Sequence, residues 1–192
     1  MSVPAVRPRP RRRAVFVDRD GTLMPDLHYL ADPEATELAS GVGDALRLFR
    51  LHDYLIVCVT NQSGVGRGLF PEETLHRIHQ RLNEKLRPYR ASVDGFYYCP
   101  HTPEQQCDCR KPGTALFHRA AEDWAIDFPT SAIIGDRLAD VEAGTKLGLF
   151  TVLIPEVAHE TLVNQELSER GIHPDVRVSS FGAAAAAVLH RG

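Results

Sequence analysis

Long apolar runs and sulfur are scarce in this chain of 192 residues, which has four cysteines and two methionines. No apolar run approaches the roughly 20 residues of a membrane-spanning helix. The basic start, MSVPAVRPRPRRR, lacks the apolar core and small-residue cleavage site of a secretory signal. A net charge of −3 gives no general attraction to nucleic acid or to an anionic membrane. We therefore expect a cytoplasmic chain that has neither as a partner.

Length and composition favour a single globular domain. A chain of 192 residues can bury a sizeable core, and 43% hydrophobic and 24% charged residues are ordinary values. Residues 1–13 contain five arginines broken by prolines, which predicts a disordered basic tail, although a nucleic-acid or membrane arm is the alternative. Residues 14–192 are predicted to form one domain, which we expect to act as a monomer.

Short apolar runs alternate with amphipathic stretches along residues 14–192. Strands are predicted at 14–17, 54–60, 93–99, 131–136, 150–154 and 176–178, and helices at 41–53, 71–89, 114–126, 139–148 and 181–191. This alternation predicts an α/β fold, a Rossmann-like parallel sheet with helices on both faces. The carboxyl ends of all its strands would meet at one edge, where such sheets bind ligands.

Polar side chains follow the apolar strands at that edge. Asp18 and Asp20 end the first strand in FVDRDGT, and residues two apart in a strand point the same way. Two carboxylates held so close repel each other unless a cation or a shared proton lies between them. Thr60, Asn61 and Asp136 end later strands and should gather beside them.

The cysteines fall into two groups. Cys58 lies in the apolar run LIVCVT and is predicted to be a buried small hydrophobic residue. Cys99, His101, Cys107 and Cys109 form the pattern C-x-H-x5-C-x-C, whose three thiolates and one imidazole are a full tetrahedral ligand set for structural zinc. A redox cysteine pair and chance clustering are the alternatives.

The ordered set DxDGT, VTNQSG, RKP and IGDRLAD resembles the haloacid dehalogenase (HAD) superfamily of aspartate-nucleophile phosphatases over about residues 14–155. The resemblance implies that Asp18 is the nucleophile and Asp20 the general acid and base. Magnesium would lie between Asp18, the backbone carbonyl of Asp20, and Asp136. Thr60 would hold the phosphate, and Lys111 would neutralise it. Taken singly, Thr60 could be a turn residue and Lys111 a surface charge.

Within that superfamily, C-x-H-x5-C-x-CRKP in place of a large cap domain resembles a subgroup of heptose-bisphosphate and histidinol-phosphate phosphatases. It implies a minimal cap with a zinc-bound loop and a small phosphorylated sugar as substrate. TNQSGVGRG and GDRLADVEAG are similar to the heptose members, whereas the short zinc loop and RKPG keep histidinol phosphate as an alternative substrate. The alternative to an enzyme is a non-catalytic binding module whose loop is held by zinc. The expected substrate-binding residues are Arg19, Asp26, Leu27, His28, Tyr29, Asn61, Gln62, Ser63, Arg110 and Arg137.

Overall fold

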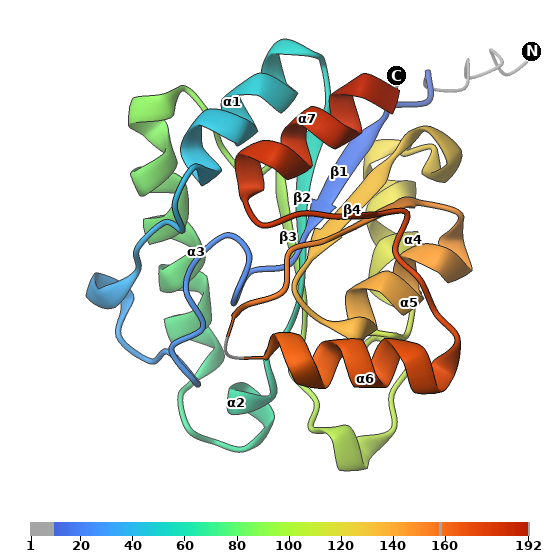
Figure 1. Cartoon of the computed structure of the whole chain (residues 1–192). Helices are drawn as coiled ribbons and strands as arrows, with labels where there is room; N and C mark the ends of the chain where they lie inside the picture. Colours follow the sequence, from blue (N-terminus) through green and yellow to red (C-terminus); the bar gives the residue numbers. More distant parts are fainter. Residues whose placement is uncertain (1–9, 158, 192) are drawn as a thin grey trace, which may run out of the picture.

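The computed structural model describes residues 10–157 and 159–191 (Figure 1). Its centre is a six-stranded sheet with the strand order β3-β2-β1-β4-β5-β6, in which every pair of neighbours is parallel. The strands are β1 (Ala14–Val17), β2 (Leu55–Asn61), β3 (Gly95–Cys99), β4 (Ala132–Gly135), β5 (Phe150–Leu153) and β6 (Val176–Arg177). The predicted parallel α/β sheet is confirmed.

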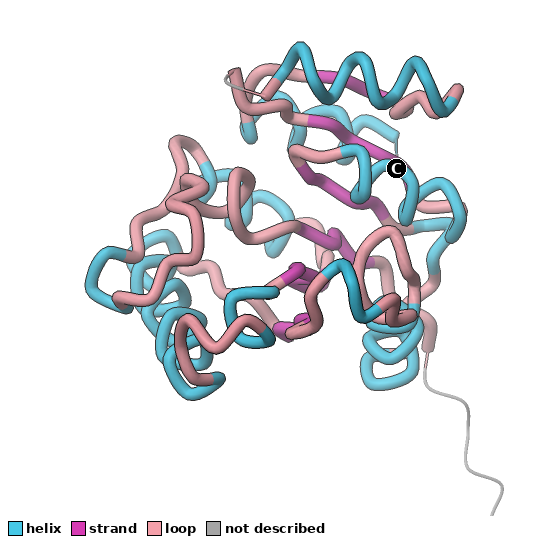
Figure 2. The backbone as a smooth tube through the Cα atoms, turned by 90° about the horizontal axis from the view of Figure 1, so that it is seen from below, coloured by secondary structure: helices cyan, strands magenta, loops and turns pink. Residues whose placement is uncertain are grey.

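Helices cover both faces of this sheet, as Figure 2 shows from below. The α-helices are α1 (Val42–Leu51), α2 (Ser63–Gly66), α3 (Glu72–Leu86), α4 (Ala115–Trp124), α5 (Leu138–Leu147), α6 (Glu160–Arg170) and α7 (Phe181–Arg191). Short 3-10 turns span Pro33–Ala35, Arg87–Tyr89, Pro103–Gln105 and Phe128–Thr130. Helices α1, α3 and α7 pack on one face, and α4 and α5 on the other. No helix in the described ranges is both long and apolar enough to cross a membrane.

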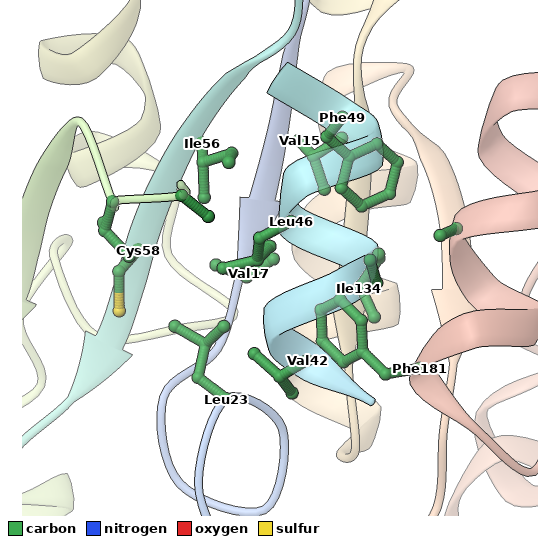
Figure 3. Close-up of a cluster of buried hydrophobic side chains, with 14 of the residues drawn as sticks. Val15, Val17, Leu23, Val42, Leu46, Phe49, Ile56, Cys58, Ile134 and Phe181 are labelled. Atoms are coloured by element: carbon green, nitrogen blue, oxygen red, sulfur yellow. The ribbon is translucent and has the colours of Figure 1, made fainter. Parts of the chain in front are cut away.

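The core explains why the strands read as unbroken apolar runs. Val15 and Val17 of β1 face α1 and α7 (Figure 3), whereas Phe16 between them faces α4. Both faces of the strand are therefore buried, and no polar alternation is possible. Cys58 on β2 has no exposed surface, which confirms it as a core residue.

Two helices were missing from the sequence-based prediction. Helix α6 buries only Val163 and Leu167 among mostly polar residues, against α5 and the end of β5. A stripe this narrow gives almost no helical periodicity in the sequence. Helix α2 is a single turn and has no pattern of its own.

The start of the described chain lies against the domain. The backbone of Arg12 forms hydrogen bonds of 2.8 Å with Ala125 and with Asp127, and Arg11 makes an ion pair of 2.7 Å with Asp127. Arg13 donates to the His52 carbonyl at 2.7 Å. Residues 1–9 of the predicted basic tail lie outside the described residues, but residues 11–13 contact the fold.

Candidate active site

A cleft of about 600 Å3 opens at the carboxyl ends of β1, β2 and β4. It lies where the strand order reverses between β1 and β4, which is the expected ligand position in an open parallel sheet. All the predicted catalytic and substrate-binding residues line it except Leu27, whose side chain stands 48% exposed outside the lining. The sheet thus brings together residues up to about 120 positions apart, as parallel topology requires.

Three carboxylates converge at the floor of the cleft. Asp18, Asp136 and Asp140 each offer an oxygen within 4.8 Å of the others, and the latter two are only 1% exposed. Burial and the charges of Asp18 and Asp140 together raise the pKa of Asp136 to about 8, against the opposing charges of Arg137 and Lys111. Oxygen ligands crowded in this way fit Mg²⁺, which relieves their repulsion.

Asp140 was not among the predicted site residues, although it stands in the quoted GDRLAD. It lies four residues after Asp136 in the first turn of α5, and its carboxylate also accepts the Arg137 backbone N–H at 3.2 Å. Gly135 makes room for it, because a Cβ there would lie 2.2 Å from the Asp140 carboxyl carbon. Its spacing of four residues from Asp136 is the sequence signal it leaves, but acids four apart are also ordinary on the solvated surface of a helix.

Lys111 is the cation of this cluster. Its Nζ lies 3.0 Å from Asp18 Oδ1 and 2.6 Å from Asp140 Oδ1, and the residue is only 4% exposed. Burial alone would lower the pKa of this ammonium, but the two carboxylates outweigh it and raise the pKa. The side-chain amide of Asn61 also binds the Lys111 backbone, at 2.9 Å to its N–H and 3.1 Å to its carbonyl. Lys111 is therefore charged and fixed in place.

Asp20 occupies a different environment from Asp18. Its carboxylate accepts from Arg19 at 2.8–3.0 Å and from the Gln62 amide at 2.7 Å. Burial raises the pKa of Asp20, the Asp18 charge raises it further, and Arg19 opposes both. Arg19 is only 1% exposed: its Nε and Nη2 donate to Asp20, whereas its buried Nη1 has no hydrogen-bond partner among the described residues. A carboxyl held with a raised pKa suits a proton donor.

The loop at residues 26–29 forms a wall of the cleft. His28 and Tyr29 have φ angles of 46° and 57°, in the left-handed region that non-glycine residues seldom adopt. Asp26 accepts from Arg137 at 3.2 Å, and Arg137 also contacts Asp136 at 2.9 Å. Arg137 therefore ties this loop to the buried carboxylates.

The cysteine cluster joins the last residue of β3, Cys99, to three residues of the loop between β3 and α4. The sulfurs of Cys99, Cys107 and Cys109 are 3.0–3.4 Å apart, and His101 Nδ1 lies 3.2 Å from Cys109 and 3.6 Å from Cys99. A zinc ion with bonds of about 2.0–2.3 Å has its ligands roughly 3.5 Å apart, so these four atoms fit one ion with little adjustment. Arg110 follows directly and lines the cleft.

Comparison with known proteins agrees with this architecture. The family model described as HAD-hydrolase-like matches residues 108–184. A protein of Haemophilus ducreyi is 40% identical over 150 residues, which are 74% of this chain and 82% of the relative. The chain therefore belongs to the HAD-like hydrolases.

The relatives carry a more particular name. The H. ducreyi protein is named D-glycero-beta-D-manno-heptose-1,7-bisphosphate 7-phosphatase. A Thermoplasma volcanium protein with the probable activity of a D-glycero-D-manno-heptose-1,7-bisphosphate 7-phosphatase is 39% identical over 65% of this chain and 86% of its own length. A D,D-heptose 1,7-bisphosphate phosphatase from B. bronchiseptica, solved with magnesium and phosphate, superimposes with a TM-score of 0.81 at 27% identity. That match covers 94% of this chain and 99% of the other.

Proposed function

We propose that this chain hydrolyses the 7-phosphate of D-glycero-D-manno-heptose 1,7-bisphosphate, with Mg²⁺ as cofactor, in the synthesis of nucleotide-activated heptose. The proposed substrate rests on the 40% identity to the H. ducreyi protein named as the phosphatase of this compound, over 82% of that protein's length. The clustered thiols, used as metal ligands, suit a reducing compartment, so we propose the cytoplasm as the location. We also propose that the working unit is a monomer.

The first half-reaction uses Asp18 as nucleophile. The Lys111 ammonium and the Arg19 backbone N–H both bind its Oδ1, at 3.0 and 2.7 Å, which leaves Oδ2 free to attack phosphorus. As the bond from Asp18 to phosphorus forms, the bond from phosphorus to the sugar oxygen breaks. Asp20, whose raised pKa favours its protonated form, gives that oxygen its proton.

The second half-reaction reverses the role of Asp20. Its carboxylate, now ionised, takes a proton from water, and the water oxygen attacks phosphorus and releases Asp18 and inorganic phosphate. Thr60, 1% exposed in the wall of the cleft, can donate its hydroxyl proton to a phosphoryl oxygen while it accepts from Gln62 at 3.0 Å. Lys111 stays paired with Asp140 throughout and neutralises charge on the phosphoryl group.

Side chains of Asp18, Asp136 and Asp140 would hold the Mg²⁺ ion, together with the expected backbone carbonyl of Asp20. When bound, the ion supplies Lewis-acid polarisation and charge neutralisation at the phosphoryl oxygens. The zinc cluster would be structural, since its four protein ligands leave no position for water. It would hold Arg110 at the cleft, where the guanidinium can bind the second phosphate of the substrate.

Histidinol phosphate remains the second candidate substrate, because the zinc loop is of the short type that resembles its phosphatases. Phosphate release from both compounds with Mg²⁺ present tests the proposal. We expect a higher kcat/KM for the heptose bisphosphate, with one phosphate released per sugar. A preference for histidinol phosphate would overturn the proposed substrate. If neither compound released phosphate, the proposed phosphatase activity would be overturned.

A further inference from the structure

A second pocket, of about 700 Å3, lies at the opposite end of the sheet from the cleft. Its lining includes residues at the amino ends of parallel strands: Arg13 before β1, Tyr54 before β2, Ala132 in β4 and Phe150 in β5. This is the upper end of the sheet in Figure 1, where β1 begins and α7 ends. Its size is within the range of small-molecule sites, and it shares no residue with the cleft.

Arginines from both ends of the described chain line this pocket. Arg11, Arg12 and Arg13 precede β1, and Arg191 ends α7. Arg11 is paired with Asp127, so the remaining three guanidiniums share the pocket with one carboxylate, that of Asp53. Such an excess of positive charge contrasts with a chain whose net charge is −3.

Aromatic rings hold two of these guanidiniums in place. Arg13 lies over the Tyr54 ring at 4.4 Å and Arg191 over the Phe150 ring at 4.8 Å. A stacked guanidinium keeps its N–H groups in a plane and presents them at its edge, which matches the oxygens of a phosphate. Arg13 donates one N–H group to the His52 carbonyl, and Arg191 donates one over a long distance of 3.4 Å to the Pro129 carbonyl.

Arg12 is the most available donor. Its side chain has no hydrogen-bond or ion-pair partner among residues 10–157 and 159–191, while its backbone is fixed to Ala125 and Asp127. The backbone thus holds an uncommitted guanidinium at the edge of the pocket. We propose that this pocket, the arginine pocket, binds the phosphate group of a small phosphorylated molecule, independently of the catalytic cleft.

Inorganic phosphate and pyrophosphate are the probes. They are titrated into the ¹⁵N-labelled, zinc-loaded full chain without added Mg²⁺. The backbone amides of Ser131 and Phe150 report the arginine pocket, and those of Asn61 and Gln62 report the cleft. We expect saturable shifts in the first group, with tighter binding of pyrophosphate because it offers more oxygens to the guanidiniums.

The test variant is the double substitution Arg12→Gln/Arg191→Gln, which leaves the structural contact of Arg13 intact. It should weaken binding at the pocket amides by at least about 10-fold, the loss expected for charge-assisted hydrogen bonds. Binding at the cleft amides and turnover should not change. The charge-matched control is Arg77→Gln/Arg119→Gln, two exposed arginines outside both pockets, and it should bind like the unmodified chain.

Three results would overturn the proposal. The first is that shifts are confined to the cleft amides. The second is that the double variant and its control lose the same affinity, which would indicate attraction to overall charge. The third is that a single-stranded oligonucleotide binds at the same amides more tightly than pyrophosphate and with an affinity that grows with its length, which would make this surface a nucleic-acid contact.

Discussion

The buried imidazole of His79 should make the stability of this protein sensitive to acid. His79 is 5% exposed, and its ring stacks on Phe96 with 4.2 Å between ring centres. Burial, together with the nearby charges of Arg19 and His76, lowers its pKa to about 3. In the unfolded chain the same group would titrate near pH 6.5.

The sign and size of the effect follow from proton linkage. Between the two pKa values, the unfolded chain binds a proton at His79 that the folded chain does not, so the free energy of unfolding falls as pH falls below about 6.5. Each pH unit costs about 1.4 kcal/mol, which gives about 2 kcal/mol between pH 7.5 and pH 5. This figure does not depend on the precise folded pKa as long as that lies well below 5.

Urea unfolding at pH 7.5 and pH 5 measures this term when it is compared between two proteins. In His79→Gln the titrating ring is gone, so the variant should lose about 2 kcal/mol less than the unmodified chain over that interval. Other titrating groups are common to both and cancel. His76→Gln, on the exposed side of the same helix, is the matched control and should behave like the unmodified chain. Equal losses in the His79 variant and the unmodified chain would refute the reasoning.

The remaining predictions concern the catalytic cleft and the zinc loop. Asp18→Asn should abolish turnover and leave the fold intact by circular dichroism, and substantial residual activity would reassign the nucleophile. Asp140→Asn removes a buried charge beside Lys111, so it should lower the free energy of unfolding in urea by up to about 3–5 kcal/mol. The same variant should need a higher Mg²⁺ concentration for half-maximal activity, and an unchanged Mg²⁺ response would exclude Asp140 as a metal ligand. Elemental analysis should find about one zinc per chain. Chelation should lower the melting temperature and raise KM more than it alters kcat. Three freely titratable thiols and no bound zinc would contradict the proposed zinc site. Arg110→Ala should lower kcat/KM for the bisphosphate about 10- to 100-fold and barely affect p-nitrophenyl phosphate, whereas Lys111→Ala should damage both; equal losses in Arg110→Ala would place this side chain at the reacting phosphate.

Local sequence signals allowed much of the fold to be predicted. Strands buried on both faces leave continuous apolar runs, and the polar residues that end them mark one edge of the sheet. That is why Asp18, Thr60 and Asp136 could be placed together from the sequence. The four residues of the cysteine and histidine cluster could be grouped from the sequence because they are close together in the chain and chemically distinctive.

Other features depend on contacts that no local pattern encodes. Arg19 was expected at the substrate, and it lines the cleft, but the hydrogen bonds of its guanidinium to Asp20 depend on the packing around it and could not be predicted from the sequence. Asp140 sits inside a helix, where an acid four residues after another is ordinary on a solvated surface. Its contact with Lys111, from a distant loop, and its convergence with Asp18 and Asp136 show that it belongs to the site.

The clamp between Asn61 and Lys111 bears on how this enzyme could change its substrate. The loop from Pro100 to Gly113 lies outside the sheet. The Asn61 side chain at the end of β2 joins to it through two hydrogen bonds, donating to the Lys111 carbonyl and accepting from the Lys111 backbone N–H. A replacement loop of different length would keep the lysine in position if it preserved these two hydrogen bonds and the ion pairs of Lys111 with Asp18 and Asp140. The loop around Arg110, which we propose contacts the distal part of the substrate, could thus be varied in an engineered protein while Lys111 and the carboxylates at the strand ends keep their places.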